Sequence, residues 1–374
     1  MSRVTPPLPR WADVFLLPLI NLTVALAICG LVILIIGENP FSALAVMLKG
    51  AFIYDGSLGY TLYYTTNFIF TGLAVAIAFH AMMFNIGGEG QAYVGGLGAG
   101  LIGVWLAPSL PLLIALPLAV LMAALFGAVW GAIPGYLQAK RGSHIVITTI
   151  MFHFIAASLM VWLLAGPLME IGQMSPRTPA IADSAVLAKV STVFAAFGIK
   201  IASSPLNLSF VVALIALVGF WVLIWKTRFG YEIRAVGQNP DAAHYAGINV
   251  SKVIIVTLAI SGGFAGLMSI NEILGVQHRV ILNFTAGYGF TGIAVALMGR
   301  NHPVGIFLAS LLFGALYQGG AELDFEFRSI TREMVLLIQG MIILFSGALA
   351  YMFNPPLARL LARIMPAREA ASNV

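Results

Sequence analysis

The chain is organised as ten long apolar runs that are separated by polar segments. A membrane-spanning helix needs roughly 20 mostly apolar residues, and most of the runs are close to that length or longer. We predict spans at residues 13–36, 60–83, 91–108, 111–139, 143–166, 206–226, 251–274, 286–299, 303–320 and 334–353. The third, eighth and ninth spans are short and glycine-rich, which is typical of broken helices that are covered by protein. The pattern predicts an all-α polytopic membrane protein with a single transmembrane domain, residues 1–374.

The order of the spans indicates an internal repeat. Residues 60–166 and 251–353 each contain four spans, and each half has a short glycine-rich span early in it. If successive spans cross in opposite directions, the two halves enter the membrane from opposite sides. The hydropathy therefore favours an inverted repeat of spans 2–5 and 7–10, an arrangement that many transporters use to build two access states.

The composition excludes most soluble classes. The chain is 60% hydrophobic and 9% charged, whereas a soluble domain carries about 25% charged residues. A net charge of +5 raises the possibility of nucleic-acid binding, but that reading needs clustered basic residues on soluble structure. Here the basic residues stand singly or in pairs between apolar runs, so we expect a lipid bilayer and no nucleic acid as the surroundings. Cys29 is the single cysteine of the sequence, so no disulfide framework or cysteine-based metal site is expected.

The charges also indicate an orientation, because cytoplasmic loops of membrane proteins are enriched in Lys and Arg. With a cytoplasmic N-terminus, 12 of the 19 basic residues lie inside. They are Arg3, Arg10, Lys140, Arg141, Lys226, Arg228, Arg234, Lys252, Arg300, Arg359, Arg363 and Arg368. Most acidic residues fall in the opposite loops. We therefore expect both termini in the cytoplasm, with an uncleaved first span, since its apolar run is longer than a signal-peptide core.

One long loop, about 227–250, is polar and densely patterned. Asn239 is a good helix N-cap, and Pro240 suits the first helical position because its missing N–H has no partner there. Asp241 complements the helix dipole, and Gly247 is placed to end the helix in a left-handed conformation. The small side chains of Ala242 and Ala243 would allow another protein to approach closely. The pattern predicts a short capped helix from Pro240 to Ala246, although an ordinary connecting loop with one helical turn fits these features equally well.

Four motifs, in this order along the chain, carry a resemblance to a known family. They are residues 84–91 (FNIGGEGQ), 145–151 (IVITTIM), 234–248 (RAVGQNPDAAHYAGI) and 261–266 (SGGFAG). The set resembles the permease subunits of ABC importers in the branch for branched-chain amino acids, ribose-type sugars and nucleosides. The first motif is most similar to the nucleoside and simple-sugar permeases. With matching hydropathy on both sides, the resemblance covers nearly the whole chain.

This resemblance implies a transport subunit rather than an enzyme. The loop at 227–250 would be the coupling loop that docks on a separate ATPase subunit. Its expected coupling residues are Arg234, Gly237, Asn239, Pro240, Asp241, Ala242, Ala243 and Gly247. The sequence contains no phosphate-binding loop of the Gly-x-x-x-x-Gly-Lys-Ser/Thr type. We therefore expect ATP and magnesium on the partner ATPases and no cofactor on this chain. A second permease subunit, identical or different, and an extracytoplasmic solute-binding protein complete the expected assembly in a bacterial inner membrane.

Polar residues within the spans are candidates for the substrate pathway. They are Asn67, His80, Asn85, Glu89, Gln91, His153, Asn271 and Glu272. Hydrogen bonding between helices explains such residues equally well. For Glu89 the structural alternative is favoured, namely a carboxylate that accepts backbone N–H groups at the start of the third span. His80 and His153 lack a second ligand at helical spacing, so no metal site is expected.

The sequence departs from the family pattern at two places. Before the fifth span, the family usually has an acidic residue where this chain has Ile145, and an amide is common at the position of His153. Both departures weaken a narrow substrate assignment. A nucleoside is the first expectation, a simple sugar the second and a branched amino acid the third. An ion-coupled secondary transporter would need paired buried acids, for which only Glu89 and Glu272 qualify. A membrane-embedded enzyme would need a polar catalytic cluster, and we predict no catalytic residue.

Overall fold

The computed structural model describes residues 16–327, 329–331, 333–342, 344–345 and 356–358, together with residues 9 and 12. Within that part of the chain the structure is helical, with two isolated β-bridges and no strand. The α-helices are α1 (Leu17–Ile36), α2 (Pro40–Phe52), α3 (Ser57–His80), α4 (Gly88–Leu101), α5 (Leu112–Arg141), α6 (Ile145–Ala165), α7 (Val190–Ala196), α8 (Ser209–Lys226), α9 (Arg228–Gln238), α10 (Pro240–Tyr245), α11 (Val250–Ser269), α12 (Tyr288–Met298) and α13 (Pro303–Glu326). Two π-helical stretches, Ile102–Leu106 and Ile270–Gln277, continue α4 and α11.

Eight helices of the described residues are long and apolar enough to cross a membrane. Each of them matches a predicted span, so the prediction of an all-α polytopic membrane protein is confirmed. The predicted span at 286–299 corresponds to α12, which has only 11 residues. The predicted span at 334–353 begins with the helix Glu333–Ile342, and residues 346–353 lie outside the described residues. The count of ten spans therefore stays a prediction.

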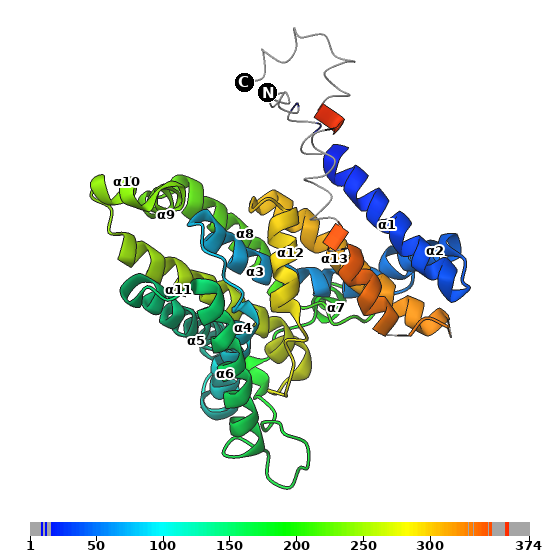
Figure 1. Ribbon diagram of the computed structural model, residues 1–374. Helices are drawn as coiled ribbons and strands as arrows, with labels where there is room; N and C mark the ends of the chain where they lie inside the picture. Colours follow the sequence, from blue (N-terminus) through cyan, green and yellow to red (C-terminus); the bar gives the residue numbers. More distant parts are fainter. Residues whose placement is uncertain are drawn as a thin grey trace. The chain divides into compact units, whose positions relative to one another are not determined.

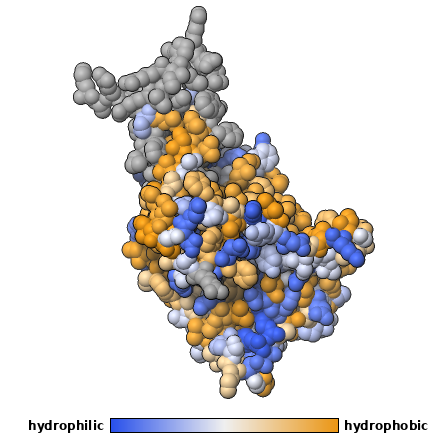
Figure 2. Space-filling model, turned by 90° about the vertical axis from the view of Figure 1, so that its right-hand side faces the viewer, coloured by the Kyte–Doolittle hydropathy of each residue, from blue (hydrophilic) through white to orange (hydrophobic). Residues whose placement is uncertain are grey.

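The surface of these helices is that of a membrane protein. Large apolar side chains are exposed along them, among them Ile35, Leu113 and Trp162. Figure 2 shows hydrophobic residues over broad areas of one face, around a region of hydrophilic residues. Exposed apolar area on this scale is unfavourable in water. The chain is a multi-pass membrane protein.

The chain forms two compact units. The first contains residues 1–50 and 316–374. In it Gly319 lies against the backbone of Met47, and the buried thiol of Cys29 donates a hydrogen bond to the carbonyl of Ile338 (3.7 Å). Helix α2 was not predicted, because its apolar stretch is too short to span a bilayer.

The second unit, residues 51–315, contains helices α3 to α12 and the first half of α13. Helices α4, α5 and α11 contact one another closely, and they lie side by side in Figure 1. Glycine makes this possible: Gly95 lies against Gly266, and Gly127 lies against Gly262. Any larger side chain at these positions would overlap the facing backbone. Small residues at helix contacts are the usual means of close packing in membranes.

The loop at 167–205, between α6 and α8, is partly ordered by short elements. It contains a 3₁₀ turn, Asp183–Ala185, and the helix α7. Two isolated bridges, Arg177–Ile281 and Lys189–Asn207, connect it to the rest of the second unit. This loop and the segment 278–287 that follows α11 form one packed region.

Candidate functional site

The polar segment between α8 and α11 folds as two capped helices. The hydroxyl of Thr227 accepts a hydrogen bond from the backbone N–H of Gly230 (3.0 Å) and starts α9. The side chain of Asn239 accepts one from the N–H of Ala242 (3.0 Å) and starts α10, with Pro240 at the first helical position. Gly247 follows with a φ of +83°. The predicted caps and turn are confirmed, but helix α9, which carries Arg234 and Gly237, was not predicted.

This segment, which we call the α9–α10 arm, rests on the second unit through its small residues. Gly237 lies on the carbonyl of His80 at the end of α3, and Gly230 lies on backbone carbonyls at the end of α8. Ala243 is buried within the chain, so it offers no surface to a partner, and the expectation that it would do so is wrong. Asp241 and Ala242 are exposed, and Tyr245 is 92% exposed. A polar and aromatic face of the arm is therefore free for another protein.

A second cluster lies where the short helices α4 and α12 begin. Glu89, in the first turn of α4, accepts hydrogen bonds from the backbone N–H groups of Gly287 (2.8 Å) and Gly289 (2.6 Å), and it also bonds the hydroxyl of Thr285. Gly289 lies directly against the backbone of Glu89. The carboxylate thus caps the start of α12, whose free N–H groups attract negative charge. The sequence favoured a carboxylate that accepts backbone N–H groups at the start of its own span, which is α4. That was wrong, because the N–H groups that Glu89 accepts belong to the start of α12.

The residues before α4 form a closed amide network. The amide nitrogen of Asn85 donates to Gln91 (2.9 Å) and to Ser261 of α11 (2.8 Å). Its oxygen accepts from the N–H of Gly87 (3.0 Å) and from the amide of Gln91 (3.2 Å). Asn85 and Gln91 are both about 1% exposed, so in this conformation they join helices and do not line a cavity.

A third cluster surrounds the π-helical end of α11. Glu272 accepts hydrogen bonds from the hydroxyl of Tyr63 and from the amide of Asn67 (2.8 Å). Asn271 donates to Asn67 (2.8 Å) and to the carbonyl of Tyr63 (3.1 Å). A π-helical turn often marks a functional site, because it redirects side chains that an α-helix would place elsewhere.

Two polar residues outside this predicted set complete the third cluster. The amide of Asn207 and the hydroxyl of Ser209 both donate to the side chain of Asn271 (2.8 Å each). They stand at the start of α8, where Asn and Ser are common residues, so the sequence did not single them out. The contact of the Tyr63 hydroxyl with Glu272 was also not predicted from the sequence.

The two histidines among the predicted residues lie apart from each other. His153 of α6 is half-buried, with its ring 5.2 Å from that of Phe290 in α12. His80 ends α3, and its Nε2 donates to the carbonyl of Asn301 (3.1 Å), since a carbonyl can only accept. Trp225 of α8 also stands against the ring of His80, at 5.3 Å. The sequence singled out His80 but not Asn301 or Trp225, which come from distant segments.

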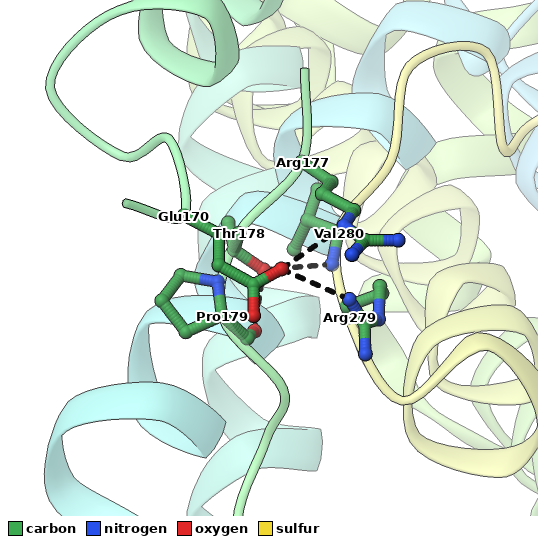
Figure 3. A network of polar contacts seen from close by, with 6 residues as sticks. All are labelled: Glu170, Arg177, Thr178, Pro179, Arg279 and Val280. Carbon is green, nitrogen blue, oxygen red and sulfur yellow. Dashed lines mark hydrogen bonds and ion pairs between the residues drawn. The ribbon is translucent and has the colours of Figure 1, made fainter. Parts of the chain in front are cut away.

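An ion-pair cluster ties the loop at 167–205 to the segment after α11. Figure 3 shows Glu170 together with Arg177 and Arg279, which approach its carboxylate at 3.0 and 3.1 Å. Beside them the hydroxyl of Thr178 accepts the N–H of Val280 (3.0 Å). Burial, followed by the charge of Lys189, lowers the pKa of the neighbouring His278. This region holds the segment that leads to the capped start of α12.

The clusters have a common design. Apolar helices surround buried polar groups, two short helices begin beside each other, and a capped polar arm stands free at one end. Buried polar groups among apolar helices, and short helices that start beside each other, are features common in membrane transport proteins.

The chain belongs to the family described as the permease component of the branched-chain amino acid transport system, whose model matches residues 57–347. It is 38% identical to the guanosine ABC transporter permease protein NupP of Bacillus subtilis, over 88% of this chain and 92% of that protein. It is 34% identical to the glucose ABC transporter permease protein TsgB13 of Haloferax volcanii (88% and 86% covered). It is 33% identical to the nucleoside ABC transporter permease protein NupB of Lactococcus lactis (88% and 90% covered). No solved structure matches the chain.

The resemblance deduced from the motifs is thereby confirmed. The relatives are named as permeases, so this chain is a transport component and not an enzyme. The assignment of individual residues to coupling or to the substrate pathway stays a prediction.

Proposed function

We propose that this permease imports a nucleoside into the bacterial cytoplasm, as half of a two-permease core in the inner membrane. ATP and magnesium would be bound by separate ATPase subunits, and an extracytoplasmic binding protein would deliver the substrate. Both termini and the α9–α10 arm would face the cytoplasm. The mechanism is alternating access, in which closure of the ATPases biases the equilibrium between two conformations of the permease.

The observation that carries the proposal is the α9–α10 arm. Helix α10 has six residues, and a helix of this length is not stable alone in water. It is nevertheless capped at both ends, with Tyr245 exposed beside the exposed Asp241. We infer that this exposed face is the surface on which an ATPase subunit docks.

The preference for a nucleoside comes from the relatives and from the polar clusters. Relatives named for guanosine and for nucleosides are 38% and 33% identical to this chain. Buried amides and carboxylates such as Asn67 and Glu272 can exchange their mutual hydrogen bonds for those of a polyhydroxylated ligand. The relative named for glucose, at 34% identity, makes a simple sugar the second candidate. A sugar would use the same hydroxyl-binding groups.

Uptake by proteoliposomes tests this function. The chain is reconstituted with its ATPase, its second permease subunit and its binding protein, and uptake of labelled guanosine and labelled glucose is compared with and without ATP. We expect ATP-dependent uptake of guanosine. ATP-dependent uptake of glucose alone would replace the nucleoside by a sugar. Uptake that needs an imposed ion gradient and no ATPase would show a secondary transporter and contradict the proposal.

A further inference from the structure

Helix α12 is short and is held at both of its ends. With 11 residues, it is about 16 Å long at 1.5 Å per residue, roughly half of a bilayer core. Its first end is held by Glu89, which accepts the N–H groups of Gly287 and Gly289. Both contacts come from α4, so the position of this end depends on α4.

The second end of α12 is held by His80. The chain leaves α12 through Arg300 and Asn301, whose φ values of +53° and +55° make a tight left-handed turn. The Nε2 of His80 donates to the carbonyl of Asn301 in this turn (3.1 Å). This hydrogen bond ties the turn after α12 to the end of α3.

The same histidine lies beneath the α9–α10 arm. Gly237 of α9 contacts the backbone carbonyl of His80, so closely that a methyl group at Gly237 would overlap it. The ring of Trp225, one residue before the last of α8, packs against the ring of His80 and against His302, at 5.3 and 5.4 Å. A displacement of the arm therefore acts directly on the residue that holds α12.

Between its two ends, α12 packs on α3 without spare room. Gly292 lies against Thr71, and Gly72 lies against Val295. Close-packed helices transmit a displacement because they cannot be compressed. Hydrogen bonds, in contrast, are lost within a fraction of an ångström beyond their normal range of about 2.7–3.2 Å. A small shift of α12 would thus reach the Glu89 contact undiminished and break it.

We propose that α12 carries movement of the α9–α10 arm into the interior of the permease, with His80 and Glu89 as its two positioning residues. This inference rests on the proposed function in one respect, that an ATPase moves the arm. It assigns Glu89 to the control of α12 and not to substrate binding. Release of the Glu89 contact would separate the starts of α4 and α12, and this separation would open the interior.

A thiol cross-link across α6 and α12 tests the proposal. In a Cys29→Ala background, His153→Cys and Phe290→Cys replace two rings whose centroids are 5.2 Å apart. Cross-linking by a short bifunctional reagent is measured in the assembled transporter, first without nucleotide and then trapped with ATP and vanadate. We expect trapping to lower the yield, because α12 moves relative to α6. The measurement needs no substrate, so it is independent of the solute that the permease carries.

Variants of His80 identify the positioning role. His80→Ala should abolish the effect of trapping on the cross-link, and in transport it should lower the uptake per ATP hydrolysed about tenfold, within the range of measured couplings between sites. His80→Gln should restore both, since an amide N–H can donate to Asn301. Thr148→Ala is the matched control, because the Thr148 hydroxyl bonds only to its own helix.

Two results would overturn the inference. One is a cross-linking yield that trapping with ATP and vanadate leaves unchanged in the protein that carries only the cysteine substitutions, even where guanosine uptake is normal. The other is a His80→Ala variant in which trapping lowers the cross-linking yield as much as it does with His80 present. A normal response in a transporter that does not carry guanosine supports the inference and contradicts only the proposed substrate.

Discussion

At the scale of single residues, the buried carboxylates show how a membrane protein shields charge. Glu89 is 5% exposed and bonds backbone N–H groups, whereas Glu272 is 3% exposed and bonds the side chains of Tyr63 and Asn67. A buried charge without such partners would be strongly unfavourable. Each carboxylate is therefore bound to a particular set of donors, and its substitution has a specific consequence.

Replacement of Glu89 should destabilise the permease in a graded way. Glu89→Ala leaves the buried N–H of Gly289 without a partner, at a cost of about 1–3 kcal/mol, and the half-buried N–H of Gly287 also loses its acceptor. Glu89→Gln keeps one acceptor oxygen, so its loss should be smaller. Thermal unfolding in detergent measures both, with Glu232→Ala as the control, since its ion pair with Arg228 is at the surface. Equal losses for the alanine and glutamine variants would contradict the capping role.

His278 should make the segment after α11 sensitive to acid. Burial lowers its pKa, and the charges of Lys189 and Arg279 act in the same direction, while Asp183 opposes them. Its folded-state pKa lies below the ordinary value of about 6.5, so its contribution to stability is present above that pH. As the pH falls below it, the unfolded chain binds a proton that the folded chain resists, and stability declines.

The test is the thermal stability of His278→Asn at pH 7.5 and pH 5.5. Asparagine tolerates the left-handed backbone that His278 adopts, at a φ of +52°. The variant should lose less stability on acidification than the wild type. His144→Gln, at an exposed position, serves as the control and should behave like the wild type. An identical acid response in His278→Asn would show that other groups cause it.

At the scale of elements, the α9–α10 arm shows how far local sequence determines structure. The cap at Asn239, the proline at the first helical position and the turn at Gly247 are local rules, and all three predictions were correct. Helix α9 was missed because its stability comes from packing, with Ile233 and Val236 buried and Gly230 against α8. Partners that are distant in sequence, such as His80 and Asn301, leave no local signal.

The turn at Gly247 should be required for coupling. A β-branched residue in the left-handed region is strained by roughly 1–2 kcal/mol, so Gly247→Val should displace the end of α10 from its position. We expect uptake to fall while ATP hydrolysis and membrane insertion persist. Gly247→Asn, which tolerates the same φ of +83°, should transport normally. Arg234→Glu, a charge reversal on α9, should uncouple the transporter in the same way. Normal uptake by both Gly247→Val and Arg234→Glu would show that the arm is not the coupling element.

At the scale of the whole molecule, hydropathy predicted the class and most of the spans, because burial in lipid imposes a length and a composition on each helix. It did not distinguish α12 from a spanning helix, since an apolar helix of 11 residues that is covered by protein has the same composition. Nor did it predict that α4 and α12 begin beside each other. That arrangement depends on the contact between Glu89 and Gly289, two hundred residues apart.

The orientation of the molecule in the membrane also stays a prediction, and single cysteines can test it. In a Cys29→Ala background, Asp241→Cys lies on the exposed arm and Met174→Cys lies in the loop at 167–205, where Met174 is fully exposed. The positive-inside rule places the first in the cytoplasm, because Lys226, Arg228 and Arg234 accompany it. A thiol reagent that does not cross membranes should therefore label Met174→Cys in intact spheroplasts and Asp241→Cys only in inverted vesicles. The opposite pattern would place the arm outside, where no ATP-driven partner could reach it, and would remove the basis for ATP-driven import by this chain.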